Sequence, residues 1–137
     1  ALVEKSPFID QVMLYNNQCT TTTALIVPNR DALRRYLKEN NIKAECEEGR
    51  KTALMKLESE LARFKKGGEF QGMFPERWLP SSFAVLAEPF TEQNQMINST
   101  MKMVRPKIEK AYKERIDYMY SSEGKQTLNA QNMQSVL

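Results

Sequence analysis

The sequence contains no histidine, and it has only two cysteines and five glycines among its 137 residues. Without histidine the chain lacks the usual general base and the commonest metal ligand, which argues against self-contained catalysis and predicts no bound metal. Cys19 and Cys46 fall in different expected elements without metal-binding spacing, so we expect free thiols in a reducing compartment rather than a disulfide. No glycine-rich phosphate loop and no nucleophile with a neighbouring base is present.

Long hydrophobic runs are also missing. The longest, Ala24 to Val27, is far short of the roughly 20 apolar residues that cross a bilayer, so no transmembrane segment is expected. Hydrophobic residues make up 41% and charged residues 27% of the chain, which is typical of a globular domain. A formal net charge of +3 permits an anionic ligand without requiring nucleic acid. The chain begins without methionine in what resembles the end of a helix, so we expect a piece of a longer protein.

The remaining pattern predicts one small domain. Apolar and β-branched runs at 8–15 and 20–27 flank the turn-forming residues 16–18, which predicts a β-hairpin, and residues 82–87 predict a third strand. Helical periodicity predicts helices at 29–40, 47–66 and 106–119, whereas the polar tail at 121–137 is expected to be frayed. The fold class is therefore α+β, with a small, three-stranded, partly antiparallel sheet covered by helices.

One stretch could carry chemistry. From Asn98 to Tyr112 the sequence predicts a polar loop that presents an exposed lysine, Lys102, followed by an amphipathic helix with Pro106 in its first turn. The neighbouring candidates are Asn98, Ser99, Thr100 and Arg105. A compact ammonium held at the start of a helix could bind an anionic ligand, although a basic loop of this kind can equally be a solvated surface.

The segment FAVLAEPFTEQNQMINSTMKMVRPKIEKAY resembles the carboxy-terminal lid of AMP-forming acyl-CoA synthetases, in particular the long-chain fatty acid ligases. The matching residues are Phe90, Thr91 and Asn94 in the loop and Thr100, Lys102 and Arg105 in the Thr-x-Lys-x-x-Arg core. The departures are Gln93 for glutamate, Gln95 for glycine, Asn98 and Ser99 for Thr-Pro, and Val104 for a second lysine. LVEKSPFIDQVMLY and ALIVPN resemble the preceding elements, so the likeness covers about residues 1–120.

The resemblance implies an enzyme of two half-reactions. In that family a fatty acid carboxylate attacks the α-phosphate of ATP to form an acyl-adenylate, and the CoA thiolate then displaces AMP. A large N-terminal adenylating domain binds ATP, magnesium and the acyl chain, and the small domain closes over it in two orientations. On this basis Lys102 is the lid lysine, and Thr100, Arg105, Asn98 and Ser99 support its loop.

The same resemblance predicts the organisation of the protein. Residues 1–120 would be the lid, truncated at its N-terminal edge and followed by a polar tail at 121–137. The 137 residues alone would be inactive and would hold no cofactor, while the parent would be a cytoplasmic ligase of fatty acid metabolism, with contact to a membrane surface left open. Its expected partners are the adenylating domain of the same chain, ATP or acyl-adenylate, and CoA.

Two alternatives remain open at this stage. The chain could be a non-catalytic basic module that binds nucleic acid or an acidic partner through Lys102, Arg105, Lys107, Lys110, Lys113 and Arg115. Acidic residues alternate with these cations, which favours a solvated helix face over a phosphate-binding stripe, so we expect no nucleic acid. The other alternative is the lid of a different adenylating acid ligase.

Overall fold

The computed structural model describes residues 7–16, 22–44, 46–65, 67–73 and 79–136. Its strands are β1 (Ile9–Tyr15), β2 (Thr23–Pro28) and β3 (Ser82–Val85). Its helices are α1 (Arg30–Glu39), α2 (Glu47–Ala62), α3 (Arg105–Ala111), α4 (Lys113–Met119) and α5 (Ala130–Ser135). The turn predicted after Tyr15 lies largely outside the described residues, as does Cys19.

The strands form one mixed sheet in the order β1-β2-β3. β1 pairs with β2 antiparallel, with Tyr15 opposite Thr23, and β3 pairs with β2 in parallel, with Ile26 opposite Val85. The predicted α+β class and the three-stranded, partly antiparallel sheet are therefore confirmed. β2 is the central strand and is buried along its whole length, which explains why its apolar run is continuous rather than alternating.

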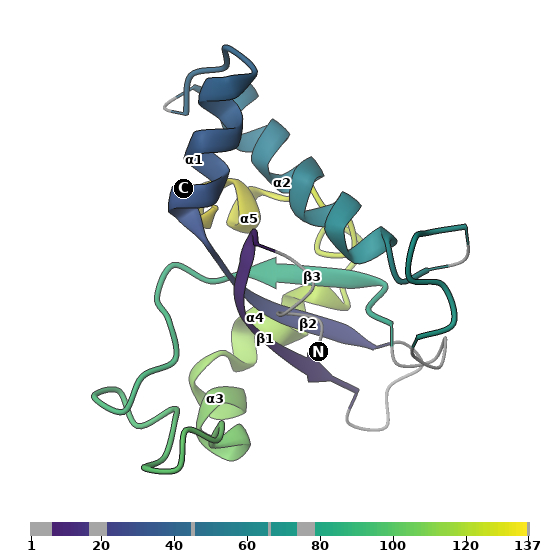
Figure 1. Cartoon of the computed structure of the whole chain (residues 1–137). Helices are drawn as coiled ribbons and strands as arrows, with labels where there is room; N and C mark the ends of the chain where they lie inside the picture. Colours follow the sequence, from purple (N-terminus) through teal and green to yellow (C-terminus); the bar gives the residue numbers. More distant parts are fainter. Residues whose placement is uncertain (1–6, 17–21, 45, 66, 74–78, 137) are drawn as a thin grey trace.

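Helices cover both faces of the sheet (Figure 1). Successive side chains of a strand point to opposite faces, so Ala24 and Ile26 belong to the core under α1, α2 and α5, whereas Leu25 and Val27 belong to the core over α3 and α4. The first core also contains Leu33, Leu54, Leu57 and Val136, and the second contains Phe90, Ile97, Ile108 and Ile116. The described part of the chain thus has a hydrophobic core on each side of its sheet.

Side-chain caps begin both α1 and α2, and the loop between the two helices is tight. The Asn29 side chain accepts a hydrogen bond from the Ala32 amide at 3.0 Å, and the Cys46 thiol accepts one from the Gly49 amide at 3.4 Å. A side chain at Gly49 would lie 2.1 Å from the Lys43 carbonyl oxygen, so only glycine fits there. Cys46 is a free, exposed thiol, and its role here is to begin α2.

The helix predicted over 106–119 is two short helices. The backbone of Tyr112 lies at φ −112° and ψ 22°, which ends α3 and separates it from α4. The buried residues Ile108, Ile116 and Met119 nevertheless face the core as their spacing predicts. Tyr112 packs with its ring centre 6.4 Å from that of Phe90, and this contact accompanies the break that the periodicity does not reveal.

The C-terminal segment differs from the frayed tail that the sequence predicts. Asn129, Asn132 and Val136 are 3%, 1% and 0% exposed, and α5 contacts β3. The Asn132 side chain accepts a hydrogen bond from the Val85 amide at 2.9 Å and donates one to the Phe83 carbonyl at 3.0 Å. It thereby pairs with the free edge of β3 as a neighbouring strand would. No helix among the described residues is long and apolar enough to cross a bilayer.

Candidate functional site

The loop that carries Lys102 is closed by the side chain of Asn98. Its amide oxygen accepts three hydrogen bonds, from the Thr100 amide at 3.0 Å, the Thr100 hydroxyl at 2.7 Å and the Lys102 amide at 3.0 Å. The backbone N–H of Asn98 in turn donates a hydrogen bond to the Lys102 carbonyl at 2.9 Å. An asparagine side chain that binds nearby backbone groups can fold a short loop without regular structure. The structure therefore brings Asn98, Thr100 and Lys102 into one hydrogen-bonded unit.

The base of this loop is joined to the core. Ile97 and Met103 form an isolated antiparallel bridge, and the Val104 amide donates to the Met96 carbonyl at 2.8 Å. Ile97 is only 8% exposed and lies in the core beside Ile108. Because both ends of the loop are held, the backbone at Lys102 has a defined position on the surface.

The tip of the loop is open to solvent. Lys102 is exposed, and no ion pair or hydrogen bond of its ammonium is found within the described ranges. Its neighbour Met101 is 72% exposed and adopts φ 64°, a backbone conformation that residues other than glycine rarely take. A flexible cation and an exposed thioether therefore stand side by side at the tip.

Arg105 and Ser99 lie at opposite ends of this region. Arg105 donates a hydrogen bond to the backbone carbonyl of Leu14, which joins the beginning of α3 to β1. Ser99 is exposed and lines a hollow of about 320 Å³ beside the loop. The structure thus places Arg105 as an anchor behind the loop, and Ser99 in a position that a ligand could reach.

Lys107, Gln95 and Glu92 line the same hollow. The sequence pattern marked Lys107 only as part of a basic helix and Gln95 only as a departure from the family pattern, and it did not predict that the three residues meet. The Lys107 ammonium contacts the side-chain oxygen of Gln95. The backbone of Gln95 has φ 64°, and Gln95 stands where the resembling family has glycine. That substitution is the signal that could have directed attention to this turn, because glycine commonly marks a positive φ.

The preceding loop is held by residues that matched the family pattern. The Thr91 and Asn94 side chains bind each other's backbone amides at 3.1 and 3.0 Å, and Asn94 also donates to the Pro89 carbonyl at 2.9 Å. Phe90 is 1% exposed, and its amide and carbonyl bind the side chain of Gln11 at 2.8 and 3.0 Å. These contacts fix the loop against β1.

Tyr112 supports the site from behind. Burial raises its pKa, and the charge of Glu88 raises it further, whereas the charge of Arg115 lowers it. The phenol therefore stays neutral and packs against Phe90 at neutral pH. Across the ranges that the structure covers, no group of three or more acidic, cysteine or histidine side chains could hold a metal ion. What the arrangement offers chemically is one positioned, solvent-facing ammonium.

No family model matches the chain. Two curated proteins resemble it at low identity. Long chain acyl-CoA synthetase 8 from Arabidopsis thaliana is 26% identical over 130 residues, which cover 88% of this chain and 17% of that protein. Carboxylic acid reductase from Mycobacterium tuberculosis is 27% identical over 122 residues, which cover 88% of this chain and 9% of that protein. The chain thus spans less than a fifth of either relative.

Solved structures show the same likeness. The adenylation domain of a carboxylate reductase from Mycobacterium chelonae is 29% identical with a TM-score of 0.60, covering 84% of this chain and 16% of that one. The adenylation domain of a carboxylic acid reductase from Segniliparus rugosus, solved with AMP and a carboxylic acid, is 25% identical with a TM-score of 0.58, again covering 84% and 16%. The chain is therefore homologous to a part of long-chain acyl-CoA synthetases and carboxylic acid reductases, both adenylate-forming enzymes.

Proposed function

We propose that this chain is the mobile C-terminal lid of a longer acid-activating enzyme, with Lys102 as the residue that serves acyl-adenylate formation. The observation that carries the proposal is the loop geometry. Lys102 is exposed, its backbone is fixed through Asn98, and its ammonium has no ion pair within the described residues. A cation held in this way is available to a ligand on an opposing surface.

The chemistry of acid activation suits such a lysine. When a carboxylate attacks the α-phosphate of ATP, negative charge develops on the phosphate and carboxylate oxygens. A positioned cation stabilises that charge most strongly where the closing domain has excluded water. The ATP, magnesium and acyl sites would belong to the adenylating domain of the same parent, and this chain would contribute only the ammonium.

The second half-reaction requires Lys102 to leave. A rigid rotation of the small domain would withdraw the lysine and present another face to CoA, so that one domain serves two steps. The contacts of Gln11 with Phe90 and of Arg105 with Leu14 support this idea, because they join the segments on either side of the loop to β1, so that the loop would move with the sheet. Thr100 and Arg105 then act by shaping and anchoring the loop.

The acid itself is a separate proposal. We propose a long-chain fatty acid, on the resemblance of residues 83–112 and on the name of the plant relative. The carboxylic acid reductase relatives favour the alternative that the chain is the lid of a different adenylating enzyme, whose activated acid or acceptor is not that of a long-chain fatty acid ligase. Activation of a carboxylic acid is common to both, and selectivity for chain length would reside in the adenylating domain.

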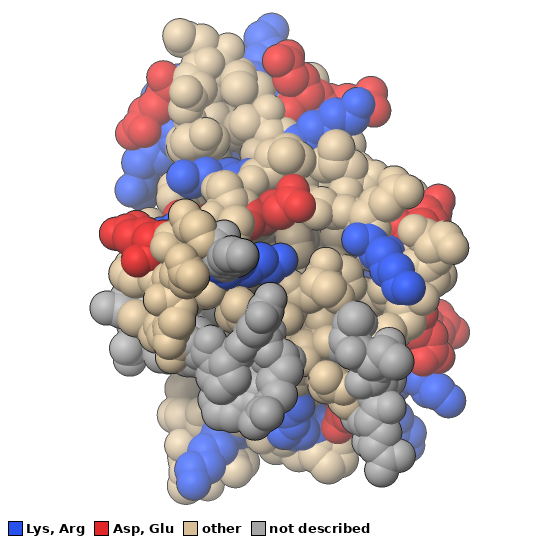
Figure 2. All heavy atoms as spheres, turned by 90° about the vertical axis from the view of Figure 1, so that its right-hand side faces the viewer, with Lys and Arg blue, Asp and Glu red and all other residues tan. Residues whose placement is uncertain are grey.

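The basic-module alternative is less well supported. Of its six cations, Arg105 binds the Leu14 carbonyl, Lys107 contacts Gln95, and Arg115 is half-buried against β3. On the face seen in Figure 2, which is the right-hand side of Figure 1 and not the side of α3, lysine and arginine are interspersed with aspartate and glutamate. Nucleic-acid binding needs cations that face outward together. A steep fall of affinity for nucleic acid with rising salt would revive this alternative.

The test is acid-dependent exchange of pyrophosphate into ATP by the parent enzyme, obtained by extending the coding sequence upstream. We expect exchange with long-chain fatty acids and acyl-CoA formation when CoA is added. Exchange with other acids only would leave acid activation standing and overturn the long-chain assignment. If no acid supports exchange, the proposed function is wrong.

A further inference from the structure

A second cationic site lies at the loop that joins α1 to α2, remote from the Lys102 loop near α3 (Figure 1). It is a hollow of about 620 Å³, lined by Arg34, Lys38, Lys43 and Arg50 together with Asn41, Ile42 and Ala44. No carboxylate is found among these lining residues. The volume falls in the range of small-molecule sites, roughly 300 to 1,000 Å³.

The charges of α1 are sorted between two stripes. Arg30, Arg34 and Lys38 follow one another at four-residue spacing, so three positive charges share one side of the helix. The neighbouring stripe, Asp31, Arg35 and Glu39, has the same spacing but alternates in sign. Like charges four residues apart destabilise a helix by about 0.2–0.5 kcal/mol for each pair. Of these six residues, only Arg34 and Lys38, both from the uniformly positive stripe, line the hollow.

Two of the arginines are held by backbone carbonyls instead of carboxylates. Arg30 donates to the carbonyls of Leu86 at 2.8 Å and Ser135 at 2.6 Å, and Arg50 donates to that of Met133 at 3.0 Å. Burial lowers the pKa of Arg30, and the charge of Arg34 lowers it further. Both guanidinium groups keep their charge. The charge of Asp10 acts on Arg30 at the start of α1 and raises its pKa in turn, whereas Arg50, which lines the hollow, is held by a neutral carbonyl that leaves its positive field in place.

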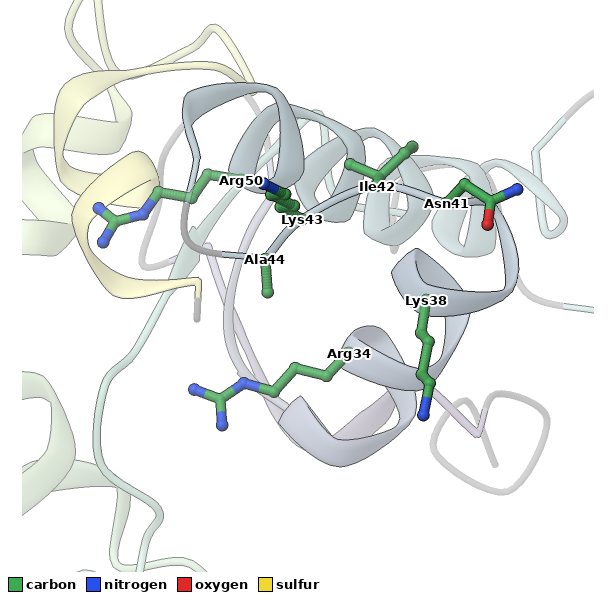
Figure 3. A pocket seen from close by; sticks show the side chains of 7 residues that line it. All are labelled: Arg34, Lys38, Asn41, Ile42, Lys43, Ala44 and Arg50. Atoms are coloured by element: carbon green, nitrogen blue, oxygen red, sulfur yellow. The ribbon is translucent and has the colours of Figure 1, made fainter.

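The side chains around the hollow have different tasks. In Figure 3, Arg34 from α1 and Arg50 from α2 extend toward the same side, with Ala44 between them, whereas Lys38 points away from both. No ion pair of Arg34, Lys38 or Lys43 is found in the part of the chain that the structure describes. Arg34 is therefore the cation best placed to contact a ligand, and Lys38 adds mainly to the field.

We propose that this hollow binds the phosphate group of a small molecule, with Arg34 as the principal contact. A guanidinium presents a planar fork of donors that matches two phosphate oxygens at once. The small side chain of Ala44 leaves room between the two arginines, and the half-buried Ile42 gives the hollow an apolar side. The site is independent of Lys102 and of the proposed function.

The test is a titration of the 137-residue chain with sodium pyrophosphate, followed by backbone amide NMR at constant ionic strength. We expect saturable shifts at residues 41–44 and at Arg50. Arg34→Gln should weaken binding about tenfold, the change that corresponds to loss of about 1.4 kcal/mol. Arg35→Gln, one residue along on the alternating stripe, is the matched control and should change affinity less than about twofold.

Parallel titrations separate the possible sources of the phosphate. Tighter binding of pyrophosphate than of AMP indicates a free polyphosphate, and the reverse indicates a nucleotide. Absence of saturation at about 10 mM of every phosphate probe, or equal weakening by Arg34→Gln and Arg35→Gln, would overturn the proposal. Tighter binding of a glutamate-rich peptide than of any phosphate would also overturn it. Lys102→Ala should leave this binding unchanged, so the two proposals can fail separately.

Discussion

Asn98 and Asn132 organise two irregular regions of the molecule by opposite means. Asn98 is exposed, and its three bonded groups lie within four residues along the chain. Asn132 is 1% exposed, and it binds Phe83 and Val85, which lie 49 and 47 residues away. The first asparagine shapes a surface loop, whereas the second joins the last helix to the edge of the sheet.

The difference in burial determines how much each asparagine side chain contributes to the free energy of unfolding. At Asn98, water can replace every lost hydrogen bond, so the contribution to stability is small and the effect is on the shape of the loop. At Asn132, water cannot reach the backbone groups of β3, so a lost partner leaves them buried and unsatisfied. The Lys102 loop is thus shaped by local contacts that water can replace, whereas α5 is joined to β3 by distant, buried contacts that water cannot replace.

Replacing Asn132 should have the largest effect on folding. Asn132→Ala removes the acceptor of the Val85 amide and the donor to the Phe83 carbonyl. Each buried group left without a partner costs about 1–3 kcal/mol, so we expect unfolding free energy to fall by about 2–4 kcal/mol in a urea titration. Gln134→Ala, exposed on the same helix, is the control and should stay within about 0.5 kcal/mol. Equal effects of the two variants would show that the hydrogen bonds of Asn132 do not stabilise the fold more than an exposed residue of the same helix does.

Arg115 tests whether the distant contacts act together. Its guanidinium donates to the Val85 carbonyl and to the Asn132 side chain, both at 3.0 Å. We expect Arg115→Met to lower the unfolding free energy by about 1–3 kcal/mol. Methionine keeps the apolar packing of a long side chain, while the hydrogen bonds of the charged guanidinium are lost. Combined with Asn132→Ala in a double-mutant cycle, the two losses should fall short of additivity by at least about 0.5 kcal/mol. Strict additivity would show that the residues act separately.

Asn98→Ala should change stability little and the loop strongly. Because its bonded groups are exposed, we expect a loss of at most about 1 kcal/mol in unfolding free energy. Hydrogen exchange of the Thr100 and Lys102 amides should accelerate, while exchange of the buried β2 amides should not. A loss comparable with that of Asn132→Ala would show that the loop is part of the folding core.

Gln95→Gly should have the smallest effect and the opposite sign. Gln95 has φ 64°, and glycine removes a left-handed strain of about 1–2 kcal/mol, although it adds about 0.5–1 kcal/mol of chain entropy to the unfolded state. We expect a net gain of about 0.5 kcal/mol in thermal or urea unfolding. Gln93 does not have a positive φ, so Gln93→Gly should instead destabilise the folded chain. Destabilisation by both changes would mean that the Gln95 contact with Lys107 outweighs the strain.

The contrast between local contacts and contacts distant in sequence explains which features the sequence could predict. The strands at 9–15, 23–28 and 82–85 follow from local apolar runs, and the polar loop before α3 follows from residues adjacent in sequence. The ordered tail could not be foreseen, because Asn132 is stabilised by groups on β3 that its own neighbours do not specify. The break at Tyr112 was hidden for a similar reason, since its contact with Phe90 comes from a distant loop.

The candidate site was predictable to the same extent. Lys102, Thr100 and Asn98 are neighbours along the chain, and the structure joins them in one loop. The hollow that Lys107 shares with Glu92 was not predicted, because it forms only when the loop folds back on α3. The cationic hollow at Arg34 was missed because Arg50 approaches it across the α1–α2 turn. Pairing of distant segments is information that periodicity does not contain.

The measurement that tests the central claim most directly compares Lys102→Ala with Lys107→Ala in the parent enzyme, in both half-reactions. We predict that Lys102→Ala slows acid-dependent ATP–pyrophosphate exchange about 100-fold or more, the usual effect of removing one group that stabilises transition-state charge. Transfer from supplied acyl-adenylate to CoA should be nearly unchanged, and Lys107→Ala should affect neither step strongly. Equal slowing of both steps by Lys102→Ala, or an equal loss of exchange in the two variants, would contradict the assignment of Lys102.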